Sequence, residues 1–141
     1  MKTFQKLQEK WDLFDIPESC SIPEEEGWIF KSALSPYEPK RILEIGFYRG
    51  GSAFMMLDLF PDATLTSVDP IFNVTDDLLS SKTDAHKEEY RALSKIENLY
   101  GRRFSFIEKK SQDVRKEVML FAGDFDFMYI DGDHWEDGSR N

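Results

Sequence analysis

Glycines that follow a short apolar run are the residues of this chain best suited to holding a ligand. The run consists of Ile42, Leu43 and Ile45 and ends at Gly46, and Gly50 and Gly51 open the next segment. Residues without a Cβ let the backbone turn sharply and approach a ligand, and the free N–H groups at a helix start favour an anionic group such as a carboxylate. Ser52 can cap that helix or bind the carboxylate. The pattern predicts a buried strand, a glycine turn and a helix start that hold a small nucleoside-like cofactor.

Two acidic residues accompany the glycines. Asp69 follows the apolar-leaning segment 65–68, and an acidic residue at the end of such a strand can accept hydrogen bonds from both ribose hydroxyls. Glu44 stands two places before Gly46, where ordering the glycine loop explains it at least as well as contact with a cofactor does. The combination predicts a cofactor site. The competing interpretation is that these residues only shape the turn between the strand and the helix and bind no ligand.

The glycine spacing also distinguishes between classes of cofactor. A dinucleotide fingerprint needs G-x-G-x-x-G, whose middle glycine admits a pyrophosphate. Here three residues separate Gly46 from Gly50, so no glycine stands where a pyrophosphate would lie. The spacing therefore opposes a nicotinamide-dependent oxidoreductase, which we keep as the less favoured alternative.

The stretch E-x-G-x-x-x-G from Glu44 to Gly50, together with Asp69, resembles motif I of class I S-adenosylmethionine-dependent methyltransferases. In that family the amino-acid end of the cofactor lies on the glycine turn. The resemblance implies a Rossmann-like α/β core with an open, mostly parallel sheet and helices on both faces. It also implies S-adenosyl-L-methionine as the cofactor and methyl transfer as the reaction.

A second group of polar residues follows the apolar segment 125–130. It contains Asp131, Asp133 and His134. Ligands of open α/β sheets bind beyond the carboxyl ends of the strands, so these residues would lie close to the cofactor. Carboxylates can bind a hard divalent ion while a histidine removes a proton from a hydroxyl. The alternative is a polar loop in which Asp133 caps a helix and His134 is exposed.

The segment from Asp131 to His134 resembles the D-x-x-H segment of metal-dependent small-molecule O-methyltransferases such as the macrocin O-methyltransferase group. In that group the aspartate binds magnesium and the histidine is the general base. The resemblance implies that Asp131 is a Mg²⁺ ligand close to the cofactor and that His134 is the catalytic base. The methyl acceptor would be a small-molecule hydroxyl, on a sugar or a phenol.

The catechol O-methyltransferase group is also similar in several places. Its Ser-Gln pair, which faces the adenine, matches Ser111 and Gln112, and a helix cap would explain Ser111 without a ligand. Its tryptophan after the metal aspartate matches Trp135, and residues near the methionine end match Tyr48 and Ser52. The cofactor ligands expected from all these positions are Glu44, Gly46, Tyr48, Gly50, Ser52, Asp69, Ser111, Gln112, Asp131 and Trp135.

Alternating helical and extended patterns define the elements that would position these residues. Strands are expected near 41–46, 64–69, 104–108 and 125–131, and helices near 51–60, 84–100 and 112–122. Such alternation predicts parallel βαβ units and a sheet covered on both faces.

The N-terminal part is predicted to be helical. Apolar residues at helical spacing indicate a helix near 2–14, and a second helix begins near Pro23 and carries Trp28, Ile29 and Leu34. We expect these helices to pack onto the sheet or onto a second copy of the chain. The expected division is an N-terminal helical segment over 1–38 and the cofactor-binding core over 39–141.

The family's domain normally has seven strands and places its remaining metal ligands after the fifth, whereas this chain reaches Asn141 just after the fourth. The resemblance therefore implies a core that is incomplete at the C-terminus, with the fourth strand at a sheet edge where a homo-oligomer could form. Asp131 and Asp133 with waters would hold an ion weakly. An inactive or regulatory S-adenosylmethionine-binding module or fragment is the alternative function.

Composition limits the classes of partner. The 141 residues are 40% hydrophobic and 32% charged, which suits a globular chain with a real core. A net charge of −9 opposes binding to nucleic acid. Cys20 is the single cysteine, which excludes an internal disulfide and fits a reducing compartment. Apolar runs are too short to cross a membrane, so we expect a soluble cytoplasmic protein that acts on a small molecule.

Overall fold

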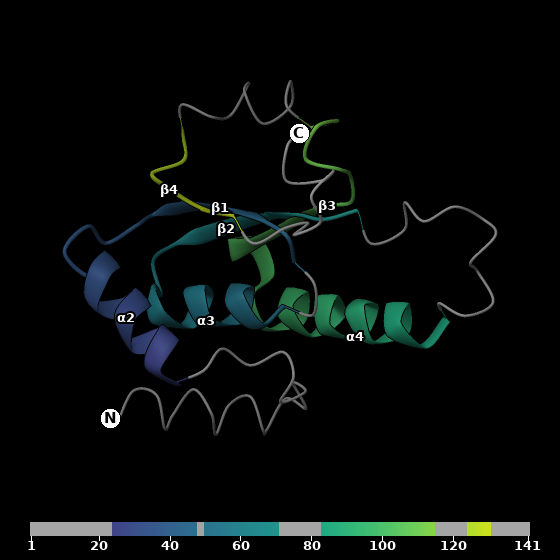
Figure 1. Ribbon diagram of the computed structural model, residues 1–141, viewed down its shortest axis with the longest axis horizontal. Coiled ribbons are helices and arrows are strands. Elements are labelled where there is room, and N and C mark those ends of the chain that lie inside the picture. Colours follow the sequence, from purple (N-terminus) through teal and green to yellow (C-terminus); the bar gives the residue numbers. More distant parts are fainter. Residues whose placement is uncertain (1–23, 48–49, 71–82, 115–123, 131–141) are drawn as a thin grey trace.

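The computed structural model describes residues 24–47, 50–70, 83–114 and 124–130 (Figure 1). Its elements are α2 (Glu24–Leu34), β1 (Arg41–Ile45), α3 (Gly51–Leu59), β2 (Thr64–Val68), α4 (Thr83–Tyr100), the 3₁₀ helix η3 (Gly101–Arg103), β3 (Phe104–Ile107) and β4 (Phe127–Ile130). The four predicted strands and the helices predicted near 51–60 and 84–100 are thereby confirmed. The helix expected near 2–14 lies outside the described residues, and so does most of the one expected near 112–122.

The four strands form one parallel sheet in the order β3-β2-β1-β4. The chain moves outward from β1 through β2 to β3 and then returns to the other side of β1 with β4. This order confirms the predicted Rossmann-like α/β class, and β4 is an edge strand of the described sheet, as expected. In Figure 1, α2, α3 and α4 all run along one face of the sheet.

The main core lies between that face and the helices. Ile42, Leu65 and Phe104 bring buried side chains from three strands to it. The core also takes in α3, whose residues 53–57 are all buried, as expected for a helix that is apolar on every side. A smaller cluster on the opposite face contains Leu43, Val68 and Val114, with Ile45, Ile107 and Phe125 packed against it. No helix among the described residues is long and apolar enough to cross a membrane.

Helix α2 packs against the edge strand β4 through aromatic rings. The ring of Phe30 meets Phe127 edge-on with centroids 5.8 Å apart, and meets Tyr129 with centroids 5.3 Å apart. Ile29, the neighbouring residue of the same helix, is 70% exposed. The aromatic side chains of β4, far along the sequence, therefore pack against the face of α2 that carries Phe30.

An aspartate fixes β4 beside the start of β1. The carboxylate of Asp126 accepts hydrogen bonds from the backbone N–H groups of Lys40, at 2.8 Å, and Arg41, at 3.0 Å. The N–H of Asp126 donates in turn to the carbonyl of Arg41, and the Arg41 guanidinium lies 3.0 Å from a carboxylate oxygen of Asp124. These contacts set the register in which Ile45 of β1 pairs with Ile130 of β4.

Candidate functional site

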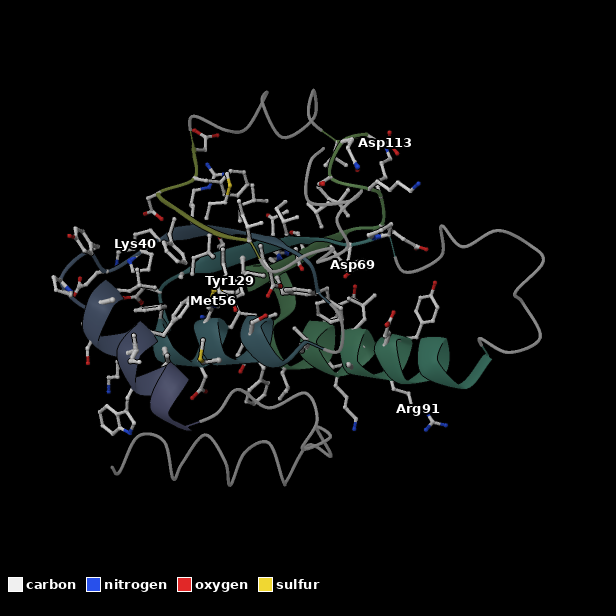
Figure 2. All side chains as sticks on the ribbon, viewed as in Figure 1. Lys40, Met56, Asp69, Arg91, Asp113 and Tyr129 are labelled. Atoms are coloured by element: carbon white, nitrogen blue, oxygen red, sulfur yellow. The ribbon has the colours of Figure 1, made fainter. Side chains whose placement is uncertain are left out.

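The candidate site lies at the carboxyl edge of the sheet, where the strand order reverses between β1 and β4. Open α/β sheets bind their ligands at such a switch point, because the loops from neighbouring strands turn away from each other there. Figure 2 shows Lys40, before β1, and Asp69, after β2, at opposite ends of the sheet. Asp69 thus lies at the edge where the glycine turn after β1 also begins.

The glycine turn requires glycine for its backbone shape. Gly46 and Gly50 have φ angles of 99° and 81°, in the region that residues with a side chain rarely adopt. Gly46 donates a hydrogen bond to the carbonyl of Val68, and Gly50 donates one to the carbonyl of Phe47, each at 2.9 Å. The turn is therefore tied to the end of β2.

Packing gives a second reason for Gly50. A Cβ there would lie 2.5 Å from Cδ1 of Ile96 on α4 and 3.0 Å from Cζ of Phe47. The missing side chain lets α4 and Phe47 approach the turn, and the expected approach of a ligand to Gly50 stays a prediction. Phe47 itself is buried, and its ring contacts those of Phe104 and Phe106.

Ser52 does not cap α3, although a cap was one expectation from the sequence. Gly50 occupies the N-cap position, without a side-chain cap bond. The Ser52 hydroxyl donates instead to a carboxylate oxygen of Glu44. Because a hydroxyl has one proton, Ser52 can offer a ligand only the lone pairs of its oxygen.

Glu44 is completely buried beneath the turn. Its second carboxylate oxygen accepts a hydrogen bond from the hydroxyl of Ser67 at 2.7 Å. The carboxylate thus joins β1 to β2 through Ser67 and to the first turn of α3 through Ser52. These contacts support the interpretation that Glu44 orders the glycine loop. Ser67 was not identified from the sequence. Without knowledge of its partner in β1, it cannot be distinguished from a strand serine that makes no specific side-chain contact.

Asp69 is the acidic residue that reaches the edge of the sheet. It is half-buried, and its Oδ2 accepts a hydrogen bond from the backbone N–H of Phe47 at 2.7 Å. Its own N–H donates to the carbonyl of Ile107, at the end of β3. Asp69 is thereby held between the ends of β1 and β3, where it can face a ligand that lies across the strands.

Beyond β3, the two expected adenine ligands lie on the surface. Ser111 and Gln112 are exposed and belong to a turn, residues 111–114, in which the N–H of Asp113 donates to the carbonyl of Lys110. Figure 2 shows Asp113 on the same side of the molecule as Asp69. Ser111 and Gln112 come shortly after the carboxyl end of β3, and their role toward a cofactor stays a prediction.

A glutamate that directly follows β3 has a shifted pKa. Burial raises the pKa of Glu108 above its usual value of 4.5. The Tyr90 hydroxyl donates to Oε1 of Glu108 at 3.4 Å, and burial, followed by the charges of Glu108 and Glu89, raises the pKa of Tyr90. This contact ties α4 to the loop after β3.

The remaining expected site residues lie outside the described residues, namely Tyr48, Asp131, His134 and Trp135. In the parts that the structure describes, no group of three or more His, Cys, Asp or Glu side chains could hold a metal ion. The described site is therefore the glycine turn with Glu44, Ser52, Ser67 and Asp69.

Comparison with solved structures shows the same fold in other proteins. Cofactor-bound Rv0187 from MTB is 16% identical with a TM-score of 0.54, and the match covers 94% of this chain and 54% of that one. The SAH-bound Podospora anserina methyltransferase PaMTH1 is 22% identical with a TM-score of 0.52, covering 89% and 49% of the two chains. A proposed O-methyltransferase from Klebsiella pneumoniae is 20% identical with a TM-score of 0.51, covering 90% and 51%. This chain spans about half the length of these proteins.

Sequence comparisons give a family. None of the curated proteins matches the chain. A family model described as a methyltransferase domain matches residues 43–141, which is more than half of the chain and includes both the glycine turn and the segment after β4. The chain therefore belongs to this family of methyltransferase domains.

Proposed function

We propose that this chain is the S-adenosylmethionine-binding core of a methyltransferase that acts on a hydroxyl group of a small molecule. The observation that carries the proposal is the glycine turn between β1 and α3, tied to Asp69 and Glu44 at the point where the strand order reverses. Membership of the methyltransferase-domain family supports it. So do similar folds in a protein bound to a cofactor, a methyltransferase bound to SAH and a proposed O-methyltransferase.

The ribose of the cofactor would bind to Asp69. One oxygen of this carboxylate already accepts the Phe47 N–H, and a carboxylate has about four lone-pair positions, so acceptors for two ribose hydroxyls fit beside that bond. The bond holds the carboxylate in one orientation before the ligand arrives. Such preorganisation favours binding, because less side-chain freedom is lost on association.

The amino-acid end of the cofactor would lie at the start of α3. The first N–H groups of a helix attract a carboxylate, and the Ser52 oxygen, whose proton points to Glu44, can accept a hydrogen bond from an ammonium group. The glycine turn suits both charged groups of an amino acid. The bound cofactor would supply an electrophilic methyl group.

The transfer step is assigned to residues after β4. We propose that His134 removes the proton of the acceptor hydroxyl and that Asp131 holds a divalent ion such as Mg²⁺ beside it. The parallel register supports this assignment, because Ile130 pairs with Ile45, so β1 and β4 end at the same edge of the sheet. A sugar or a phenol is the proposed acceptor.

Titration of the 141-residue chain with S-adenosylmethionine and S-adenosylhomocysteine by calorimetry tests the cofactor assignment. We expect saturable binding of both, none of NADH, and loss of binding in Asp69→Ala. Asp62→Ala is the matched control, because Asp62 is an exposed aspartate whose contact is an ion pair with Lys40 at 3.6 Å. A folded chain that binds neither ligand would refute the proposal.

A methyl-transfer assay tests the proposed transfer to an acceptor hydroxyl. With radiolabelled cofactor, Mg²⁺ and a panel of phenols and sugars, we expect transfer by the wild type and none by His134→Ala, which should still bind the cofactor. Binding without transfer to any acceptor would favour the alternative of a cofactor-binding module.

A further inference from the structure

Ser67 is a buried polar residue in the middle of a strand. Its exposed fraction is 0%, and it pairs in register with Glu44 of β1, which is also 0% exposed. Burial of a hydroxyl in a strand is unfavourable unless the hydroxyl finds a hydrogen-bond partner. Ser67 has one in the Glu44 carboxylate, whose Oε2 lies 2.7 Å from its Oγ.

The bond constrains more than one oxygen. A carboxylate is planar and rigid, so holding Oε2 also fixes the direction of Oε1, which accepts the hydroxyl of Ser52. Ser52 belongs to the first turn of α3, directly after Gly50 and Gly51. Ser67 therefore acts, through one intermediate side chain, on the part of the turn that would receive the amino-acid end of the cofactor.

We propose that Ser67 is a positioning residue of the cofactor site. This inference rests on the proposed function, because it concerns the same glycine turn. Ser67 is buried and reaches the ligand only through Glu44 and Ser52. Its hydroxyl keeps the Glu44 carboxylate in place, and Glu44 accepts the hydrogen bond that the Ser52 hydroxyl donates. Ser52 is thereby oriented so that its oxygen lone pairs face the ligand.

Substitution of Ser67 tests the role. In Ser67→Ala we expect the affinity for S-adenosylhomocysteine, measured by calorimetry, to fall about tenfold, which corresponds to about 1.4 kcal/mol. Ser67→Thr keeps the hydroxyl and suits a strand, so its affinity should stay within about threefold of the wild type. Ser105→Ala is the matched control, because Ser105 is an exposed serine of β3. Its affinity for S-adenosylhomocysteine should equal that of the wild type. Wild-type affinity in folded Ser67→Ala would overturn the proposal.

A double-mutant cycle separates positioning from a general loss of stability. If Ser67 acts on the ligand through Ser52, the tenfold loss should shrink to less than about twofold in the Ser52→Ala background. A merely structural serine would weaken binding by the same factor in both backgrounds, and that additive result would contradict the inference.

Amide hydrogen exchange on the unliganded chain gives a second readout that needs no binding. The N–H of Phe54 donates to Gly50 in the first turn of α3, at 2.9 Å, and the N–H of Phe60 donates to Met56 at the other end, at 3.0 Å. Ser67→Ala should speed exchange at Phe54 about tenfold and leave Phe60 unchanged. If the wild type binds neither S-adenosylmethionine nor S-adenosylhomocysteine, the proposed function fails for this chain. Separately, equal exchange rates at Phe54 in the wild type and in Ser67→Ala would refute the role of Ser67.

Discussion

The carboxylate of Asp69 accepts a hydrogen bond from the backbone N–H of Phe47, with 2.7 Å between Oδ2 and nitrogen. The acidic residue after β2 therefore shapes the glycine turn after β1, at the edge of the sheet where the ribose of the proposed cofactor would bind. Because the donor is a backbone group, the contact depends on the carboxylate and not on which side chain stands at position 47. This double role predicts that substitutions of Asp69 affect stability and ligand binding to different degrees.

Asp69→Asn should separate the two roles. Its amide oxygen can still accept the Phe47 N–H, so thermal unfolding should stay close to that of the wild type. The loss of one anionic oxygen should weaken S-adenosylhomocysteine binding by at least about tenfold, since hydrogen bonds to charged groups contribute about 1.5–3 kcal/mol. Asp69→Ala should lose both stability and binding. Equal affinities of the asparagine variant and the wild type in calorimetry would contradict the assignment of Asp69 to the ribose.

Gly50→Ala should destabilise the protein more than Gly101→Ala. Both glycines have positive φ angles, 81° and 54°, so either alanine is strained by about 1–2 kcal/mol. Only at Gly50 does the new Cβ also meet other atoms, 2.5 Å from Ile96, whereas nothing lies within 4 Å at Gly101. Urea unfolding measures the difference in free energy of unfolding between the two variants. Because of overpacking, we expect Gly50→Ala to be less stable than Gly101→Ala by about 1–3 kcal/mol.

The Ile96→Val variant provides the control. Removing the Cδ1 atom that the new Cβ would meet should recover part of the cost of Gly50→Ala, and none of the cost of Gly101→Ala. If the two alanine variants are equally stable, backbone conformation alone accounts for both glycines.

The fold was predictable because its signals are local. Each strand is a short apolar run, and the carboxyl ends of parallel strands share one edge, so Gly46 and Asp69 could be placed together from the sequence. The sequence predicted the helix α2 but not which of its faces is buried. Phe30, and not Ile29, meets β4, since the rings of Phe127 and Tyr129 come from a distant segment.

The details of the site depend on contacts that no local pattern contains. Ser67 donates a hydrogen bond to Glu44 across the pairing of β1 with β2, and Gly50 takes the cap position that was one of two roles expected for Ser52. Residue types and spacing identified which residues surround the turn. Which of them bond to one another depended on the register of the strands.

Arg103 should contribute to stability far from the candidate site. Its guanidinium donates to the carbonyls of Leu57, Phe60 and Ala63 at 2.6, 2.8 and 2.9 Å. Carbonyls at a helix end lack helical partners, so this side chain satisfies the end of α3 and joins it to the start of β2. At about 1 kcal/mol for each hydrogen bond, Arg103→Ala should lower the free energy of unfolding by about 2–3 kcal/mol.

The neighbouring arginine is the matched control for that measurement. Arg102 is exposed, so Arg102→Ala should change the free energy of unfolding by less than about 0.5 kcal/mol. Affinity for S-adenosylhomocysteine should be the same in Arg103→Ala, when folded, as in the wild type. A stability loss of equal size in both variants would show that charge, and not the carbonyl contacts, explains the effect.

The raised pKa of Glu108 predicts how stability depends on pH. Burial disfavours the charged carboxylate, so the folded protein binds this proton more tightly than the unfolded chain does, whose value is near 4.5. The proton thus stabilises the fold fully below the unfolded pKa, and this contribution disappears as pH rises through the folded pKa. Glu108→Gln cannot ionise and can still accept the Tyr90 hydroxyl. Its melting temperature relative to that of the wild type should therefore rise as the pH increases above about 4.5, because the wild type loses that contribution there. A difference in melting temperature that stays constant over this range would show that Glu108 titrates alike in both states.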